Sequence, residues 1–309
     1  MQKELEKNKK LLVIGGTGFF GKSILDSFQR GLLQKFKISE VILMARNTSK
    51  FINDFPELIG NNVHLVKGDI CVSENIPYAD IVIHAASSTN QSDYIKDSAN
   101  QKTNIEKATE NYCALANRFH KNAKIVYCSS GAVYGQQPFH LEKIAENELF
   151  QDVESLPIEK RDYARGKRNA ENGIIELGKE GLSVSIARCF AFSGKYLPKD
   201  QHFAYGNFIG QAERGKDIIV TAKNPVYRSY MSADDLVDSL IMIALNSNQS
   251  CPIYNVGSDE AILIHDLAKK IAEDYGVKYK ISKDLDWNLI DRYVPDCEKL
   301  KKLKTNLNI

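Results

Sequence analysis

Three side chains near the middle of the chain have the types and spacing needed to move a proton. Tyr163 and Lys167 are four residues apart, so a helix would place both side chains on one face. A lysine ammonium beside a phenol favours the phenolate, which makes tyrosine usable as an acid or base. Ser130 follows the apolar run 124–128, where a parallel sheet would open its ligand crevice. A Tyr-Lys pair at this spacing also arises by chance on helix surfaces. The nearby Ser130 favours a catalytic site over this alternative.

Glycines near the start of the chain recur in a pattern typical of a phosphate-binding turn. They follow the apolar run 11–14 and open a helical segment. Because glycine lacks a Cβ, Gly15 can make the turn, Gly18 can admit a pyrophosphate, and Gly21 can let the helix pack closely on the strand. The sequence predicts a bound dinucleotide, against the alternative of an ordinary glycine-rich turn. The predicted cofactor contacts in this turn are Gly15, Thr17, Gly18, Phe19, Phe20 and Gly21.

The end of the second apolar run indicates which dinucleotide to expect. No Asp or Glu lies between Val41 and Arg46 to accept a ribose 2′-hydroxyl, whereas Arg46 and Lys50 could face a 2′-phosphate. NADP(H) is therefore favoured, and NAD(H) is the alternative if Arg46 is only a surface residue or stacks on adenine. Asp69 and Ile70 follow the third apolar run and are expected to contact the adenine, although a Gly-Asp pair is also a common turn.

Apolar runs and helical segments alternate along the chain, which predicts an α/β fold with a doubly wound parallel sheet. The predicted strands are residues 11–14, 41–44, 63–67, 81–84, 124–128 and 183–187, and the predicted helices between them are 21–30, 95–120 and 162–178. Residues 189–226 are expected to be irregular, and they are followed by a helix at 233–245, a strand at 253–256 and a helix at 264–275. We predict a Rossmann domain over residues 10–190 and a smaller, mainly substrate-binding domain over 191–309, with some of its segments returning to the first.

The composition argues against several classes of protein. With 309 residues, 43% of them hydrophobic, the chain can bury a large core. A net charge of +2 is too small for a nucleic-acid or membrane surface, and no apolar stretch approaches the roughly 18–20 residues of a membrane span. We therefore expect a cytoplasmic protein whose lysine-rich ends are solvated tails. The six cysteines form no Cys-x-x-Cys pair, so they are expected to be reduced packing residues, and no metal site is predicted.

Further segments match one family in order along the chain. Besides the glycine turn, they are His84-Ala85-Ala86, Asn104, Ser130, Tyr163, Lys167, Arg228-Ser229-Tyr230, Asp234-Asp235, Tyr254-Asn255-Val256-Gly257 and Arg292-Tyr293-Val294-Pro295-Asp296. In these segments, and over nearly its whole length, the chain resembles the extended short-chain dehydrogenase/reductase family. This family contains nucleotide-sugar epimerases, dehydratases and reductases.

The resemblance implies a role for each matched residue. Tyr163 is expected to be the general acid or base, Lys167 to hold the nicotinamide ribose, and Ser130 to hydrogen-bond the sugar oxygen. Lowering the pKa of a tyrosine from about 10 towards neutrality needs roughly 4 kcal/mol, part of which Lys167 can supply. The other expected cofactor contacts are Ala85, Ala86, Ser87, Asn104 and Ser129.

The expected substrate is a nucleoside-diphosphate sugar. By the same resemblance, Arg228 and Asn207 bind its diphosphate, and Ser88 lies near the sugar with Ser130. The alternative for Arg228 is a salt bridge to Asp234 or Asp235.

Gly131 and Ala132 indicate the branch of the family. Dehydratases carry an Asp-Glu pair at these positions, and sugar-acid decarboxylases carry a glutamate at the second, so both reactions lack their carboxylate here. The reactions that need no such carboxylate are reduction and epimerisation at C4 of the sugar. Arg46 favours reduction with exchangeable NADPH over epimerisation with retained NAD. Ala191, where many relatives have asparagine, suits a 6-deoxy sugar, although the neighbouring phenylalanines could equally be packing residues.

Within the family the chain is most similar to reductases of dTDP-4-keto-6-deoxyglucose in O-antigen (lipopolysaccharide) biosynthesis. A non-catalytic NADP-binding regulator is the alternative from another class, and the Tyr163–Lys167 pair argues against it. Family resemblance also implies a homodimer in which helices 95–120 and 162–178 form a four-helix bundle. Because the chain ends soon after Asp296-Cys297, a final helix is expected to be short or missing.

Overall fold

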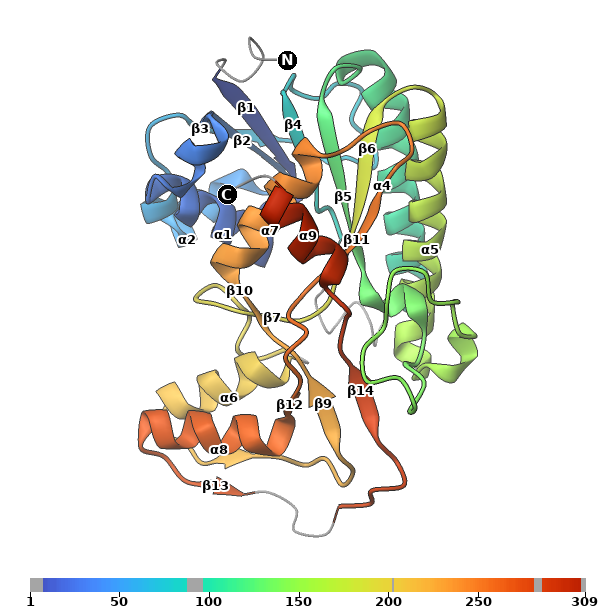
Figure 1. Ribbon diagram of the computed structural model, residues 1–309. Helices are drawn as coiled ribbons and strands as arrows, with labels where there is room; N and C mark the ends of the chain where they lie inside the picture. The colour runs from blue at the N-terminus through green and yellow to red at the C-terminus, as the bar shows by residue number, and fades with distance from the viewer. Residues whose placement is uncertain (1–7, 88–96, 202, 281–284, 307–309) are drawn as a thin grey trace.

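The computed structural model describes residues 8–87, 97–201, 203–280 and 285–306. Its centre is a seven-stranded sheet in the order β11-β6-β5-β4-β1-β2-β3, with every neighbouring pair parallel (Figure 1). The strands are β1 (Lys9–Ile14), β2 (Ile38–Ala45), β3 (Val63–Lys67), β4 (Ile81–His84), β5 (Lys124–Ser130), β6 (Ser183–Cys189) and β11 (Ile253–Val256). The chain order reverses between β1 and β4, and ligands of such sheets bind outside the strand ends at this switch point.

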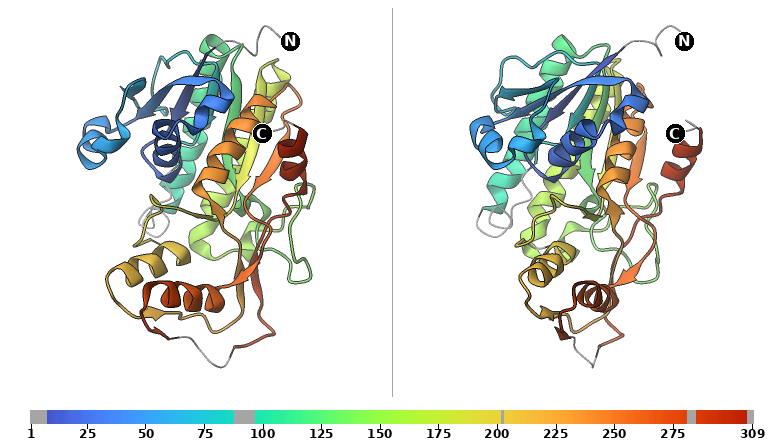
Figure 2. Two further views of the ribbon diagram at one scale, coloured as in Figure 1. Left: turned by 60° about the vertical axis from the view of Figure 1, so that its left-hand side comes forward. Right: turned by 90° about the vertical axis from the view of Figure 1, so that its left-hand side faces the viewer.

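Helices cover both faces of this sheet, as the alternating pattern predicts (Figures 1 and 2). Strand β1 shows why: Leu11 and Val13 point into one hydrophobic cluster, and Leu12 and Ile14 point into another. The first cluster is covered by α1 (Phe19–Gln29), α7 (Ala233–Leu245) and α9 (Glu298–Asn306). The second is covered by α4 (Ser98–Phe119) and α5 (Ile158–Lys179). The doubly wound α/β fold is therefore confirmed.

A smaller group of elements lies beyond the carboxyl ends of the strands (Figure 1). Helices α6 (Ala204–Glu213) and α8 (Ile264–Tyr275) pack with a sheet of β12 (Ile262–Leu263), β9 (Val226–Arg228) and β14 (Asp291–Tyr293) around a third hydrophobic cluster. The remaining elements are α2 (Thr48–Asp54) and the pairs β7 (Phe192–Ser193) with β10 (Met231–Ser232) and β8 (Ile218–Ile219) with β13 (Tyr279–Lys280). The domain division at residue 190 stays a prediction.

One expectation about secondary structure and one about burial are wrong. The segment 189–226, expected to be irregular, contains α6, whose glycines hide its helical pattern. A Cβ on Gly206 would lie 2.1 Å from the Pro198 carbonyl oxygen, so glycine is needed where this helix touches the preceding segment. The lysine-rich C-terminus is not a solvated tail, because Leu300 and Leu303 of the short helix α9 are 1% and 7% exposed and join the first core cluster.

No helix in the described part of the chain is long and apolar enough to cross a membrane. All six cysteines are free thiols, and four of them are buried.

Candidate active site

Helix α5 places Tyr163 and Lys167 against strand β5. Lys167 is 2% exposed, and its ammonium donates to the Cys128 carbonyl oxygen at 2.8 Å and to the Tyr127 hydroxyl at 3.3 Å. Its Nζ lies 5.9 Å from the centre of the Tyr163 ring, and Tyr163 is 8% exposed. The structure thus brings together the phenol and the amine that the spacing in the sequence puts on one helix face.

Burial sets the protonation of this lysine. Loss of solvent lowers the pKa of Lys167 to about 8, while negative charge on Cys128, Cys189 or Glu171 would raise it. The ammonium is therefore still the major form at neutral pH, but it titrates much closer to neutrality than an exposed lysine does. A charged Lys167 beside Tyr163 favours the phenolate.

Ser130 is the last residue of β5, which extends two residues further than predicted. Its hydroxyl oxygen accepts a hydrogen bond from the Ala132 backbone at 3.2 Å and begins a 3₁₀ turn over Gly131–Tyr134. The hydroxyl of Tyr293 from β14 donates to the Cys189 carbonyl oxygen at 3.5 Å and lies close to Ser130 and Tyr163. Burial raises the pKa of Tyr293. Sequence reasoning placed Tyr293 in a family segment but did not foresee that it enters this site.

Tyr293 and Phe190 fill the space next to Gly131. A Cβ added to Gly131 would lie 2.6 Å from the Tyr293 hydroxyl oxygen and 2.8 Å from carbons of the Phe190 ring. The two rings are tilted against each other with centres 4.6 Å apart. Any larger side chain at residue 131, a carboxylate included, would have to displace one of these rings.

We therefore expect Gly131→Ala to lower the free energy of unfolding by about 1–3 kcal/mol through overpacking. Denaturant unfolding measures this. Gly173→Ala is the matched control, because its Cβ would meet only Thr109 at 3.6 Å, an ordinary contact. The double variant Gly131→Ala/Tyr293→Phe should recover part of the loss. If Gly131→Ala is as stable as the wild type, Tyr293 does not occupy this space.

The glycine turn has the geometry of a dinucleotide cradle. Gly15 has φ +81°, and a Cβ there would lie 2.4 Å from the Ala86 Cα. A Cβ on Gly21 would lie 1.7 Å from the Gly16 carbonyl oxygen, whereas one on Gly18 would meet nothing within 4 Å. Gly18 is the N-cap of α1 and has no side-chain cap, so the first N–H groups of the helix are left for an anion.

The turn also lies against the segment after β4. The hydroxyl of Ser87 is buried without a hydrogen-bond partner in the described part of the chain, as a group awaiting a ligand would be. Thr17, Phe19, Phe20 and Ala85 are partly buried in or beside the turn. Ser88 lies outside the described residues.

The other predicted cofactor contacts differ in their exposure and in the hydrogen bonds that they already make. Arg46 is exposed just past β2 with no ion pair to a described carboxylate, so a phosphate could approach it. The Asp69 carboxylate accepts from the Cys71 N–H at 3.0 Å and holds its own turn, and Ile70 is 5% exposed in the second core cluster. Asn104 is exposed on α4. The hydroxyl of Ser129 turns instead to Glu171, at 2.6 Å.

Arg228 ends β9 in the smaller group of elements. Its guanidinium donates to the Asp291 carboxylate at 2.7 Å, so the alternative of a salt bridge to Asp234 or Asp235 is wrong. Those carboxylates are engaged elsewhere, Asp234 by Arg30 and Asp235 by Lys304.

The Arg228 guanidinium also lies 6.0 Å from the ring centre of Tyr293, whose hydroxyl lies close to Ser130. Asn207 lies in the first turn of α6 rather than ahead of the helix. Both residues stay predictions as diphosphate contacts.

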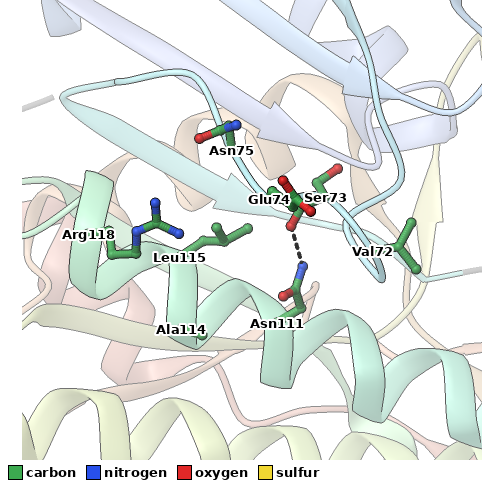
Figure 3. Close-up of a pocket in the computed structure, with 8 residues that line it drawn as sticks. All are labelled: Val72, Ser73, Glu74, Asn75, Asn111, Ala114, Leu115 and Arg118. Carbon is green, nitrogen blue, oxygen red and sulfur yellow. Dashed lines mark hydrogen bonds between the residues drawn. The ribbon is translucent and has the colours of Figure 1, made fainter.

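A separate hollow of about 510 Å³ lies over α4 (Figure 3). It contains none of the predicted site residues, and Asn111 on its floor donates to the Ile70 and Ser73 carbonyl oxygens at 2.8 and 2.9 Å. These backbone contacts hold the loop after β3, so the hollow is a surface feature of that loop.

Comparison with known proteins agrees with this geometry. The family model described as "NAD dependent epimerase/dehydratase family" matches residues 11–257. UDP-glucuronic acid decarboxylase 3 of Arabidopsis thaliana is 27% identical over 271 residues, covering 87% of this chain and 75% of the relative.

Solved structures share the fold. UDP-N-acetylglucosamine 4-epimerase from Methanobrevibacter ruminantium M1 superposes with a TM-score of 0.77 at 20% identity, over 96% of this chain and 92% of that one. DesIV, a dTDP-glucose 4,6-dehydratase from Streptomyces venezuelae with NAD bound, gives 0.76 at 18% identity over 95% and 90%. The chain belongs to the NAD dependent epimerase/dehydratase family.

Proposed function

We propose that this protein uses NADPH to reduce the C4 ketone of a nucleotide-linked 4-keto-6-deoxyhexose, with dTDP as the nucleotide. The observation that carries the proposal is the space beside Gly131, which Tyr293 and Phe190 fill. Neither Gly131 nor Ala132 can offer the carboxylate that dehydration or decarboxylation needs next to Ser130. Hydride chemistry at C4 requires only one acid, and Tyr163 supplies it. The relationship to a sugar-acid decarboxylase therefore does not extend to that reaction.

In this reaction Tyr163, Ser130 and Lys167 would each have a separate role. Tyr163 donates its phenolic proton to the ketone oxygen, and Ser130 donates a hydrogen bond to the same oxygen. Lys167 uses two of its three donors on Cys128 and Tyr127, which leaves one N–H for the nicotinamide ribose. Its charge stabilises the phenolate until a proton returns from solvent. A bound nicotinamide dinucleotide would supply the hydride.

Arg46 supports NADPH as the reductant. It lies exposed at the end of β2, where the strand offers no carboxylate to a ribose 2′-hydroxyl. A guanidinium there can pair with a 2′-phosphate through charge-assisted hydrogen bonds. The structural relative DesIV is described with NAD bound, so NAD(H) is the competing choice for this chain.

A nucleotide-sugar 4-epimerase is the second candidate. It needs the same Ser130, Tyr163 and Lys167 and no further acid or base, because it removes a hydride from C4 and returns it to the other face. It would retain NAD rather than consume NADPH, which makes the two candidates separable. A non-catalytic NADP-binding regulator, the third candidate, would have no use for the buried Lys167 beside Tyr163.

The deciding experiment incubates the purified protein with dTDP-, UDP-, GDP- and CDP-linked 4-keto-6-deoxy sugars and either NADPH or NADH. We expect stoichiometric loss of NADPH with the dTDP-linked ketone and an alcohol at C4 of the product by NMR. Epimerisation of UDP-glucose without added cofactor would favour the second candidate. Cofactor binding with neither reaction would favour the regulator.

We also propose a homodimer in which α4 and α5 pair with their copies in a four-helix bundle. These helices lie side by side on one face of the sheet (Figure 1). Sedimentation at micromolar concentration should show a dimer, and a monomer would refute this assembly.

A further inference from the structure

A buried carboxylate beside the site has no role so far. Glu171 lies one helical turn beyond Lys167 on α5 and is 3% exposed. Its Oε1 accepts from the Ser129 hydroxyl at 2.6 Å, next to Ser130 in the chain. Glu171 therefore connects the helix that carries Tyr163 and Lys167 directly to the strand that ends in Ser130.

Arg188 of β6 holds this carboxylate from the other side. Its Nε donates to Glu171 Oε1 at 3.0 Å, and its Nη2 donates to Oε2 at 2.8 Å. Its Nη1 donates to the Tyr134 hydroxyl at 3.0 Å, and that hydroxyl donates to Asn255 of β11 at 2.8 Å. Helix α5 and strands β5, β6 and β11 thus meet in one buried network of charge-assisted hydrogen bonds.

Fold stability alone does not explain such a pair. Removing two charges from water costs several kcal/mol per ion, and well-packed apolar residues in their place are often equally or more stabilising. What apolar side chains lack is a fixed direction and a fixed distance. The Glu171 carboxylate binds Ser129 on the strand of Ser130 and Arg188 on β6. These two contacts fix the position of helix α5 along the sheet.

We propose that Glu171 is the positioning residue of this site, holding the helix with Tyr163 and Lys167 in register with the strand that carries Ser130. The inference rests on the proposed function only in taking these three residues as the reacting set. A loss of this anchor would shift the reacting groups by fractions of an ångström, which lowers the rate more than substrate affinity.

The charge of Glu171 gives an independent signature. The titratable groups facing Lys167 are Tyr127 and Cys128 of β5, Tyr163 and Glu171 of α5, Cys189 of β6 and His84 of β4. Burial has the largest effect on the pKa of Lys167 and lowers it, whereas negative charge at Cys128, Cys189 or Glu171 raises it. Removing the Glu171 charge must therefore move the titration of Lys167 below its value of about 8 in the wild type.

The test compares Glu171→Gln with three variants. Glu171→Asp keeps the charge but shortens the reach. Glu171→Gln/Arg188→Met removes both charges, so the Glu171 change can be studied without an unpaired Arg188 in the core. Glu176→Gln, whose carboxylate is exposed on the same helix and binds Lys179, is the matched control.

Two readouts are needed. Kinetics should show kcat about 10- to 100-fold lower in Glu171→Gln with KM nearly unchanged, partial recovery in Glu171→Asp, and no change in Glu176→Gln. An NMR titration of lysine labelled with ¹³C at Cε, with Lys167 assigned through Lys167→Met, should show a lower pKa in Glu171→Gln and in the double variant. Glu171→Asp should titrate like the wild type.

The proposal is overturned if the double variant regains the wild-type kcat, because the network then serves only the fold. An unchanged Lys167 titration in both variants that lack the Glu171 charge would overturn it as well. The NMR measurement needs no sugar substrate. If no nucleotide sugar reacts, the proposed function fails, but the NMR titration still tests the role of Glu171.

Discussion

Replacing Tyr163 with phenylalanine is expected to lower turnover by roughly 100- to 10,000-fold, the usual contribution of a positioned acid or base. The ketone oxygen would lose its proton donor, while the glycine turn around Gly15 and the buried Lys167 would be unaltered. Affinity for NADPH should therefore stay near that of the wild type. Loss of NADPH absorbance with the best substrate measures turnover, and calorimetric titration measures cofactor binding.

Tyr127→Phe is the control for this prediction, because Tyr127 is the rival phenol. Its hydroxyl lies 3.3 Å from the Lys167 ammonium, but the side chain is 1% exposed and burial raises its pKa well above the usual value of 10. A phenol so deeply enclosed cannot reach a substrate, so Tyr127→Phe should keep most of the activity. Full turnover in Tyr163→Phe would show that Tyr163 is not the general acid. A greater loss of turnover in Tyr127→Phe than in Tyr163→Phe would make Tyr127 the general acid instead.

The fold was largely predictable from the sequence because its signal is local. Strands buried on both faces read as continuous apolar runs, and the strands at 63–67, 81–84 and 253–256 were predicted with their observed bounds. Helix α6 was missed because glycines that permit close contact with the preceding segment also interrupt its apolar pattern. The burial of the short helix α9 was missed because its lysines outnumber the two leucines that pack into the core.

The site was predictable only where its residues share an element or follow a strand. Tyr163 and Lys167 lie on one helix, and Ser130 ends the adjacent strand, so their meeting follows from spacing and topology. Tyr293 reaches Ser130 from the far end of the chain, and nothing in its own neighbourhood predicts that contact.

The Glu171–Arg188 pair did leave a signal in the sequence. Glu171 continues the Tyr163–Lys167 spacing by one more turn, and Arg188 is the one charged residue of the strand β6. A charged residue in a buried strand calls for a buried partner, and the face of α5 that carries Lys167 offers one.

Replacing Arg228 with alanine is expected to raise the KM for the nucleotide sugar by roughly 10- to 100-fold, because one or two charge-assisted phosphate contacts would be lost. Arg228 lies on β9, apart from the glycine turn, so affinity for NADPH should be nearly unaltered. Initial rates at varied sugar concentration, together with cofactor titration, separate the two effects. Equal loss of both affinities would show that Arg228 supports the fold of the smaller group of elements instead.

Asp291→Asn tests the same contact from the opposite direction. The Asp291 carboxylate lies 2.7 Å from the Arg228 guanidinium, so it would compete for this cation with a diphosphate bound there. The two residues are partly exposed, so solvent screens their attraction and a doubly charged diphosphate can displace the carboxylate. Removing the charge of Asp291 ends this competition and lessens the repulsion of the phosphates, so free dTDP should bind more tightly to Asp291→Asn than to the wild type. Weaker binding of dTDP would mean that Asp291 orients Arg228 for the substrate. Unchanged binding would mean that the diphosphate does not bind at Arg228.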